Sequence, residues 1–483
     1  MTHISNHNIK AARGAFWNYI QQFGTLAIQF VVAIILARLL EPAEFGLIGM
    51  LTIFIQIANI LIQGGLTQSL IRSKSIDDSD LSTVFYFNLA ASSLMYLVIY
   101  ILAPWVAIFY DQAILVPLLR VLALTFVINS FSVVQITILT KELNFKKQSI
   151  ITLIAVILSA SFAIYTAQHG WGVWSLVLQQ VMASIFLGIL FWVSSQWRPS
   201  LFFSKEKFKE HFNFGYRLTI SGLLNVIFNN LYLIVIGKVF APAALGYYTQ
   251  AHKLRDLPLN TISSTLNKIT FPYFSKLEND VELKERLRQV IRITLFISSP
   301  ILILLAMLAP EFLQVLLSSK WLPAAPYLSL LCLAGLLYPI NAFMLNILLV
   351  KGKSEKFLKL EVIKKVLIAF SILLTFKHGI IALIIGKIVL MLIVTPLNGY
   401  YLHALIDYNF KEQLSDLIAF TIPATALGVI LYYIKMHYSI ATDNISILFI
   451  FGVLYTFLYL LIVRFIKPSI FALTMQLLKT IKK

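Results

Sequence analysis

Apolar stretches of about twenty residues recur along this chain from Gly14 to Lys467, and each is long enough to cross a hydrocarbon core about 30 Å thick. Of the 483 residues, 59% are hydrophobic and only 12% are charged, so the chain has more apolar side chains than a soluble core of this size can bury. Because a helix satisfies its own backbone hydrogen bonds in lipid, we predict an all-α integral membrane protein with one continuous membrane domain.

Hydropathy predicts about fourteen transmembrane helices. The first apolar stretch is too long for a signal peptide and has no small-residue cleavage site, so the first helix is predicted to be retained. The expected helices cover residues 14–37, 44–69, 81–103, 114–138, 149–168, 172–195, 214–237, 243–267, 290–309, 324–349, 358–376, 379–402, 416–436 and 444–466.

The distribution of basic residues predicts the topology. About thirty of the 39 Lys and Arg residues lie at the termini or in the connections after even-numbered helices. We therefore predict that both termini are cytoplasmic. The net charge of +18 is then explained by topology and by contact with anionic membrane lipids, and no nucleic-acid partner is predicted. The opposite connections contain only Arg38, Arg120, Lys238, Lys320, Lys377 and Lys435.

An internal repeat divides the chain. The segment 37–46 recurs 200 positions later as 237–246, with a basic residue, two apolar residues, then Pro-Ala and Gly in register. The two copies are six predicted helices apart, and an even spacing gives parallel halves related by an axis along the membrane normal. The predicted domains are an N-terminal lobe at 1–195, a cytoplasmic linker at 196–212, a C-terminal lobe at 213–403, and two further helices with a cytoplasmic tail at 404–483.

Polar side chains follow one face of the first two helices of each half. Steps of three and four residues keep each set on one face, which predicts a hydrated cavity shared by the lobes. The alternative is that these amides and hydroxyls hold helices together. The members are Asn18, Gln21 or Gln22, Thr25, Gln29, Thr52, Gln56, Asn59, Gln63, Ser221, Asn225, Asn229, Tyr232, Thr249, Lys253, Asp256, Asn260 and Asn267.

The segment 252–256, His-Lys-Leu-Arg-Asp, is the sharpest feature of the sequence. If its helix begins near Ala243, a rise of about 1.5 Å per residue places Lys253 roughly 15 Å deep, near the bilayer centre. A charge there costs about 2.5 to 3.5 kcal/mol on insertion scales, which makes the segment a functional-site hypothesis. The alternative is a helix that ends at Pro258, with Lys253 and Arg255 at a cytoplasmic interface.

An excess of cations at this depth favours an anionic ligand that carries phosphate, because Arg matches phosphate oxygens bidentately and Lys acts as a point charge. Lys387, in the helix expected at 379–402, either adds to this site or pairs locally. Asp256 is expected to pair with Lys253 or Arg255, or to carry a coupling proton or sodium ion.

Motifs for catalysis, metal binding or cofactor binding are not found in the sequence. The single cysteine, Cys332, excludes an internal disulfide, and the eight histidines do not pair at metal-ligand spacing. No Gly-rich phosphate loop of Walker type occurs. We therefore predict a protein that is not an enzyme and uses no cofactor or metal.

The chain resembles a polysaccharide or O-antigen flippase of the multidrug/oligosaccharidyl-lipid/polysaccharide exporter superfamily. The resemblance covers nearly the whole chain, and its motifs mark the family rather than one saccharide. They are the turn at 37–46, Gly246-Tyr247-Tyr248, Leu257-Pro258, Phe271-Pro272-x-Phe274-Ser275, Trp321-x-Pro323-Ala324-x-Pro326-Tyr327 and Lys351-Gly352-Lys353-Ser354.

The resemblance implies two six-helix lobes around a central cationic cavity that works by alternating access. The implied cargo is an undecaprenyl-pyrophosphate-linked oligosaccharide for O-antigen, capsule or exopolysaccharide synthesis. On this hypothesis Lys253 and Arg255, with Arg217 or Lys387, hold the pyrophosphate, and the amides contact sugars or water. The last two helices are implied to form a groove for the lipid tail. Polysaccharide polymerase and chain-length machinery are candidate partners.

Two other functions stay open at this point. A cation-coupled multidrug exporter of the same superfamily would need intramembrane carboxylates, for which Asp256 is the candidate. A membrane polysaccharide polymerase or ligase would normally have a large outer loop with Arg or His, which the short predicted connections do not provide.

Overall fold

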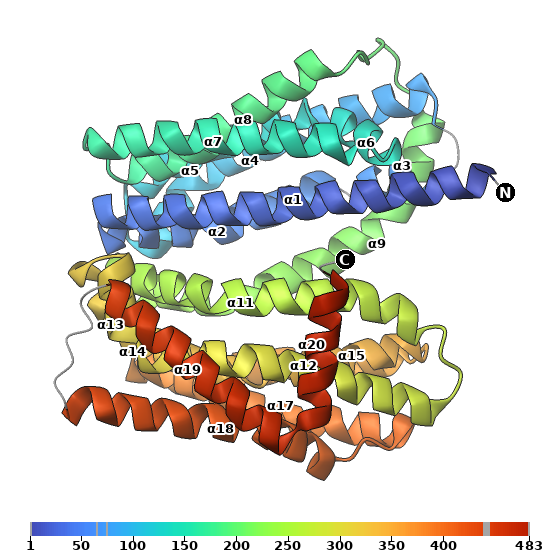
Figure 1. Ribbon diagram of the computed structural model, residues 1–483. Coiled ribbons are helices and arrows are strands. Elements are labelled where there is room, and N and C mark those ends of the chain that lie inside the picture. The colour runs from blue at the N-terminus through green and yellow to red at the C-terminus, as the bar shows by residue number, and fades with distance from the viewer. Residues whose placement is uncertain (1, 64–65, 74–75, 438–444, 482–483) are drawn as a thin grey trace. The chain divides into compact units, whose positions relative to one another are not determined.

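The computed structural model describes residues 2–63, 66–73, 76–437 and 445–481, and within these ranges the regular structure is helical, without strands (Figure 1). Contacts between residues divide the chain into two compact units, Met1–Gly246 and Tyr247–Lys483. The predicted all-α class is confirmed, whereas the predicted lobe boundaries at 195 and 213 stay a prediction.

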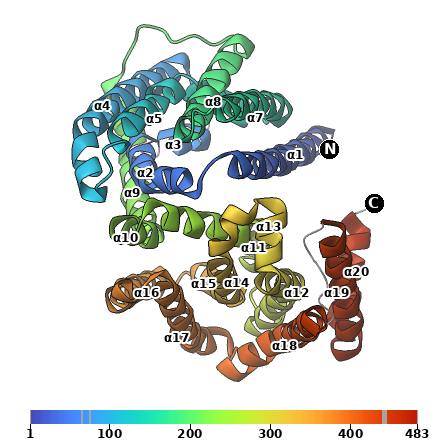
Figure 2. The ribbon, with the colours of Figure 1, turned by 90° about the vertical axis from the view of Figure 1, so that its left-hand side faces the viewer.

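The first unit contains ten helices of the described chain. Neighbouring helices such as α4 and α5, and α7 and α8, run side by side and can be followed nearly end-on in Figure 2. The helices are α1 (Thr2–Leu39), α2 (Pro42–Gln63), α3 (Leu66–Arg72), α4 (Asp78–Tyr110), α5 (Leu115–Ser130), α6 (Val133–Lys141), α7 (Phe145–Gln168), α8 (Val173–Ser194), α9 (Lys205–Asn229) and α10 (Leu231–Val239).

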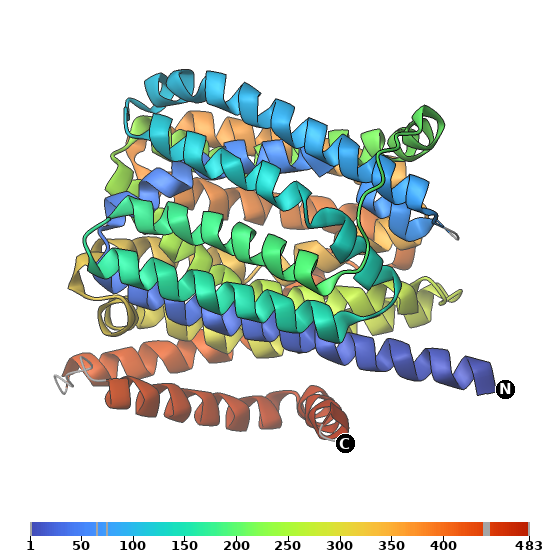
Figure 3. The ribbon, with the colours of Figure 1, turned by 90° about the horizontal axis from the view of Figure 1, so that it is seen from above.

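The second unit contains most of α11 and the elements that follow it. Helices α18 and α19 pack side by side in Figure 3, and α20 crosses their direction in Figure 1. The elements are α11 (Pro242–Phe274), α12 (Asp280–Met307), α13 (Ala309–Leu316), η1 (Ser319–Ala324), α14 (Ala325–Gly335), α15 (Tyr338–Val350), α16 (Ser354–Thr375), η2 (Phe376–His378), α17 (Ile380–Ile406), α18 (Phe410–His437), α19 (Ile445–Ile466) and α20 (Pro468–Ile481).

The helices of the described chain include ten that are long and apolar enough to cross a membrane, or up to twelve if each of two bent helix pairs is one span. The remaining expected spans correspond to α11 and α16, which are long helices but carry several charged residues each. The protein is thus a multi-pass membrane protein, and the count of fourteen stays a prediction.

Two expected helices bend by more than 40° at a short break. The span predicted at 114–138 bends by 44° between α5 and α6, and the span predicted at 214–237 bends by 42° between α9 and α10. At the first break Ser130 and Ser132 donate hydrogen bonds to the carbonyls of Val127 and Asn129. At the second, Asn230 donates to the carbonyl of Val226. Short polar side chains that bond to the preceding turn bend membrane helices, which explains both breaks.

The repeated turn forms the same structure in both copies. Helix α1 ends at Leu39 and α2 begins at Pro42, whereas α10 ends at Val239 and α11 begins at Pro242. The two turns touch reciprocally: a Cβ atom on Gly46 would collide with the carbonyl oxygen of Pro242, and one on Gly246 would collide with the carbonyl oxygen of Pro42. Glycine at both positions therefore allows two backbones to approach closely, as small residues do between membrane helices.

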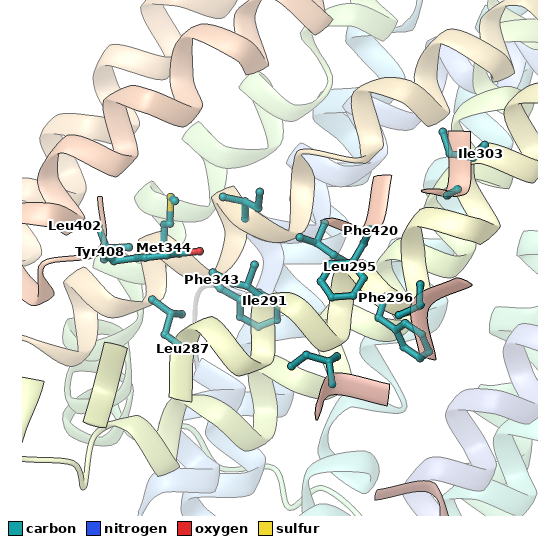
Figure 4. Close-up of a cluster of buried hydrophobic side chains, with 14 of the residues drawn as sticks. Leu287, Ile291, Leu295, Phe296, Ile303, Phe343, Met344, Leu402, Tyr408 and Phe420 are labelled. Atoms are coloured by element: carbon teal, nitrogen blue, oxygen red, sulfur yellow. The ribbon is translucent and has the colours of Figure 1, made fainter. Parts of the chain in front are cut away.

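The core of the second unit is an apolar cluster that joins several helices. Leu287, Ile291, Leu295 and Phe296 of α12 pack with residues of α15, α17 and α18, including Phe420 (Figure 4). These side chains are nearly or fully buried, and large buried aromatic and aliphatic groups dominate the packing energy of such a core. Helices α18, α19 and α20 therefore pack against α12.

Buried charges also join α18 to α12. Asp416 accepts hydrogen bonds from Arg288 Nε at 2.6 Å, Arg292 Nε at 2.7 Å and the Tyr408 hydroxyl at 3.0 Å. Its side chain is 1% exposed, whereas the two arginine side chains are about a quarter exposed. Glu412 extends this Asp416 network by accepting from Arg288 Nη1 at 3.2 Å. A buried carboxylate with this many donors is fully satisfied.

Candidate functional site

Helix α11 carries the segment 252–256 in its N-terminal half. The helix runs without interruption over 33 residues and continues through Pro258, so the alternative in which it ends at that proline is wrong. A proline removes one backbone hydrogen bond but is tolerated in long membrane helices whose neighbours support them. Lys253 and Arg255 therefore lie well inside a long helix rather than at its end.

Lys253 is the exposed residue of this part of the helix. Between residues 242 and 259, every other side chain is buried or half-buried. On the predicted span formed by α11, a lysine that faced lipid would be costly, so an exposed position there would call for water or a bound anion. Lys253 is thus the exposed cation in a stretch of α11 whose other side chains are buried or half-buried.

Arg255, His252 and Asp256 form a compact group that we call the Arg255 cluster. Arg255 is 6% exposed, and its Nη2 lies 2.9 Å from His252 Nε2. Asp256 Oδ2 lies 3.1 Å from His252 Nδ1, and Asp256 Oδ1 lies 2.8 Å from Arg255 Nε. The steps of three and four residues from His252 place all three side chains on one face of α11.

The Arg255 guanidinium is only partly satisfied. Its Nε is buried and has no hydrogen-bond acceptor, although Asp256 Oδ1 is close enough for an ion pair. The contact with Asp256 is therefore electrostatic and leaves one guanidinium N–H without an acceptor. A buried donor in this state is costly and often marks a functional group.

Residues of other helices surround the Arg255 cluster. Lys387 of α17 lies within electrostatic range of His252, Arg255 and Asp256. Gly335 of α14 leaves space for Arg255, because a Cβ atom there would lie 3.3 Å from Arg255 Cδ and 3.0 Å from a methyl group of Leu259. The site thus contains two cations and one carboxylate, a balance that favours an anion.

The predicted cationic residues do not all come together. Arg255 and Lys387 are neighbours, as the sequence allowed. Lys253 is two residues from Arg255, a rotation of about 200° around the helix, so the two side chains lie on opposite faces. This agrees with the exposure of Lys253 and the burial of Arg255. The side chain of Arg217, in α9, lies outside the described residues.

The predicted polar stripes have mixed outcomes. Gln56 accepts a hydrogen bond from Asn230 at 2.9 Å, and Gln21 donates to Thr152 of α7 at 3.2 Å, so these two amides join helices. The side chains of Gln63 and Asn260 lie outside the described residues. Gln22, Thr25 and Asn59 are half-buried, whereas the exposed members are Asn18, Gln29, Asn225 and Asn229.

Two residues of these contacts were not predicted. His252 bridges Arg255 and Asp256, and its spacing of three and four residues from them was the signal in the sequence. Asn230 rather than Asn229 contacts Gln56, because the break after α9 changes the helical phase. That break had no signal in the hydropathy pattern.

The architecture also matches proteins of known structure. A lipid II flippase MurJ in an inward closed conformation superposes with a TM-score of 0.73 at 13% identity, covering 94% of this chain and 99% of that one. A multidrug resistance MATE family transporter of the MOP superfamily gives a TM-score of 0.60 at 19% identity, covering 79% of this chain and 95% of that one. The chain therefore shares the fold of these two membrane proteins.

Residues 35–326 match the family described as polysaccharide biosynthesis protein, and the chain belongs to that family. The teichuronic acid biosynthesis protein TuaB of Bacillus subtilis (strain 168) is 26% identical over 438 residues, 90% of either chain. The succinoglycan biosynthesis transport protein ExoT of Rhizobium meliloti (strain 1021) is 27% identical over 334 residues, 69% of this chain and 68% of that protein. The predicted resemblance is confirmed.

Proposed function

We propose that this protein flips a polyprenyl-pyrophosphate-linked oligosaccharide repeat unit across the bacterial cytoplasmic membrane by alternating access. The family match and the names of TuaB and ExoT, which concern polysaccharide biosynthesis and its transport step, support this function. The product serves the assembly of a surface polysaccharide. The protein acts as a transporter, not as an enzyme, and a polysaccharide polymerase with its chain-length machinery takes up the flipped unit.

The exposed Lys253, which lies in the N-terminal half of α11 and is predicted to be near the bilayer centre, carries the proposal. A charge at this depth is stable only in contact with water or an anion, and the pyrophosphate of a lipid-linked sugar is an anion that must pass this depth. The buried Arg255 and its neighbour Lys387 add positive potential behind it. Together they favour a diphosphate over a neutral or cationic cargo.

The remaining predicted site residues have supporting roles in this proposal. Arg217 adds a cation on α9, and Asp256 keeps the net charge low when no substrate is bound. The amides Asn18, Gln22, Gln29, Asn59, Asn225 and Asn229, with Thr25, Gln56, Gln63 and Asn260, contact sugar hydroxyls or water. Many weak polar contacts suit a cargo whose sugars vary.

Flipping in proteoliposomes tests this function. The purified protein is reconstituted with a fluorescent polyprenyl-pyrophosphate oligosaccharide, and outward movement is followed by quenching from outside. Lys253→Gln and Arg255→Gln are each expected to reduce the flipping rate by about 100-fold, which corresponds to about 2.7 kcal/mol. Lys377→Gln is the matched control, because it removes one exposed cation in η2 and is expected to leave the rate unchanged.

Two results would contradict the proposal. Undiminished flipping by the folded Lys253→Gln protein would remove that residue from the mechanism. Transport of a cationic dye with no transport of the pyrophosphate lipid would favour the multidrug exporter instead.

The proposed topology has both termini in the cytoplasm and two parallel lobes, at 1–195 and 213–403. Cys332 is the single cysteine and is buried in α14, so Cys332→Ala gives a background for labelling. New cysteines replacing Lys377 and Lys351 are expected to react from outside and from inside, respectively, with a membrane-impermeant maleimide. Equal labelling of both from outside would contradict this topology.

A further inference from the structure

His252 lies between a cation and an anion in a geometry that fixes its proton. Arg255 Nη2 can only donate, so the His252 Nε2 atom 2.9 Å away must accept and carries no proton. Asp256 as a carboxylate can only accept, so the His252 Nδ1 atom 3.1 Å from it carries the proton. The structure therefore requires a neutral imidazole.

We infer that His252 is a positioning residue for the anion site, and that its protonation at Nε2 is linked to binding of the pyrophosphate group. This inference rests on the proposed function and deepens it. A proton on Nε2 would put an N–H opposite the N–H of Arg255 and would break their hydrogen bond. The imidazolium would keep its contact with Asp256 and add one positive charge.

Both consequences of protonation favour an anion. The Arg255 Nε is already buried without an acceptor. Protonation of His252 also removes the acceptor of Arg255 Nη2, so a second N–H group of the guanidinium becomes available to an anion. The site also changes from two cations and one carboxylate to three cations and one carboxylate. By linkage, a bound diphosphate must then increase proton binding to the same degree. Anion affinity is therefore expected to rise as the pH falls.

The groups that face His252 are few in the described part of the chain. On α11 they are Arg255, Asp256 and the ring of Tyr248, whose centroid lies 5.8 Å from the imidazole. Lys387 of α17 acts on it electrostatically. Cys332 of α14 and Tyr338 of α15 interact with Arg255 and Asp256. Among these groups the imidazole ordinarily titrates between about pH 5 and about pH 8, and the His252→Gln variant separates its titration from that of the Lys387 amine.

Binding of a soluble probe at different pH values tests the inference on the full chain in nanodiscs. The probe is geranyl-pyrophosphoryl-glucose, a diester whose charge is constant over this range, whereas a phosphate monoester would titrate near pH 6. Affinity of the unmodified protein is expected to rise about tenfold between about pH 8 and about pH 5. His252→Gln keeps an acceptor for Arg255 but cannot titrate, so its affinity is expected to be independent of pH.

The control is His378→Gln, an exposed histidine of η2, which is expected to keep the pH profile of the unmodified protein. If His252→Gln shows the same slope as the unmodified protein, or if the unmodified protein binds in an Arg255-dependent way without any slope, the inference is overturned and the proposed function stands. If the folded protein binds the probe at no pH, the proposed function and the inference both fail.

Calorimetry on the unmodified protein gives a second test that needs no variant. Binding heats measured in buffers of different ionisation enthalpy give the protons taken up with the probe. Net proton uptake near neutral pH supports the linkage, and the absence of uptake across the range overturns it.

Discussion

The Arg255 cluster and the Asp416 network contain the same kinds of groups in different arrangements. In the Asp416 network a carboxylate of α18 receives donors from α12 and from Tyr408, and its oxygens are saturated. In the Arg255 cluster all three members come from consecutive turns of α11, and the guanidinium keeps a buried N–H without an acceptor. One arrangement joins two helices, whereas the other leaves a cation under-satisfied on a single helix.

This difference identifies the Asp416 network as the structural cluster. A saturated carboxylate between helices stabilises the packing of α18 on α12 and has no capacity for a ligand. A partly satisfied arginine with a second cation nearby has free donors that an anion could use. Burial and sequence composition alone do not separate the two cases, because Asp416 and Arg255 are both buried.

The largest expected effect concerns stability. Asp416→Asn removes the charge that balances Arg288 and Arg292 and turns an amide NH2 toward their donors. We expect a loss of about 3 kcal/mol in the free energy of unfolding, the lower end of the range for a broken buried pair because both arginines are partly exposed. Asp256→Asn keeps an acceptor for His252 and is expected to lose about 1 kcal/mol. Thermal unfolding in detergent measures both, and equal losses would show that the two clusters do not differ.

The second effect concerns affinity. Here Asp256→Asn is expected to have the larger effect and Asp416→Asn the smaller. Asp256→Asn removes the one carboxylate of the Arg255 cluster, so the affinity for a pyrophosphate diester is expected to increase about tenfold, or about 1.4 kcal/mol. Asp416→Asn is expected to leave the affinity of the folded protein unchanged. Binding measured by calorimetry at neutral pH checks both variants. A weaker affinity for Asp256→Asn would mean that Asp256 helps to hold the ligand.

The smallest effect comes from the space that Gly335 leaves. A Cβ atom in Gly335→Ala would press on Leu259 and Arg255 at 3.0 and 3.3 Å, so the guanidinium must shift. We expect a loss of about 1 kcal/mol in stability and about a threefold loss in anion affinity. Gly452→Ala is the control, because its Cβ atom would meet Leu304 at an ordinary 3.6 Å. Equal affinities of the two variants would show that the position of the Arg255 side chain does not affect anion binding.

The sequence predicted the membrane class, the family and the helix boundaries at the repeated turn. Those features depend on local hydropathy and on prolines, both of which are visible in the chain itself. The breaks at Ser130 and Asn230 were missed, because a polar side chain that bends a helix looks the same as one that packs it.

The site was predicted in part. The opposite directions of Lys253 and Arg255 follow from their spacing of two residues. By contrast, the proximity of Lys387 to Arg255 depends on how α17 packs in the second unit, which no pattern along one helix contains. The assignment of any of these residues to substrate stays a prediction.

The reciprocal contact of Gly46 and Gly246 has a consequence for how this chain can change over time. Each glycine leaves room for a carbonyl oxygen that belongs to the other repeat, so neither copy can gain a side chain there unless the opposite backbone moves as well. A side chain at either position would need a compensating shift in the opposite turn, so the two copies of the repeated sequence constrain each other.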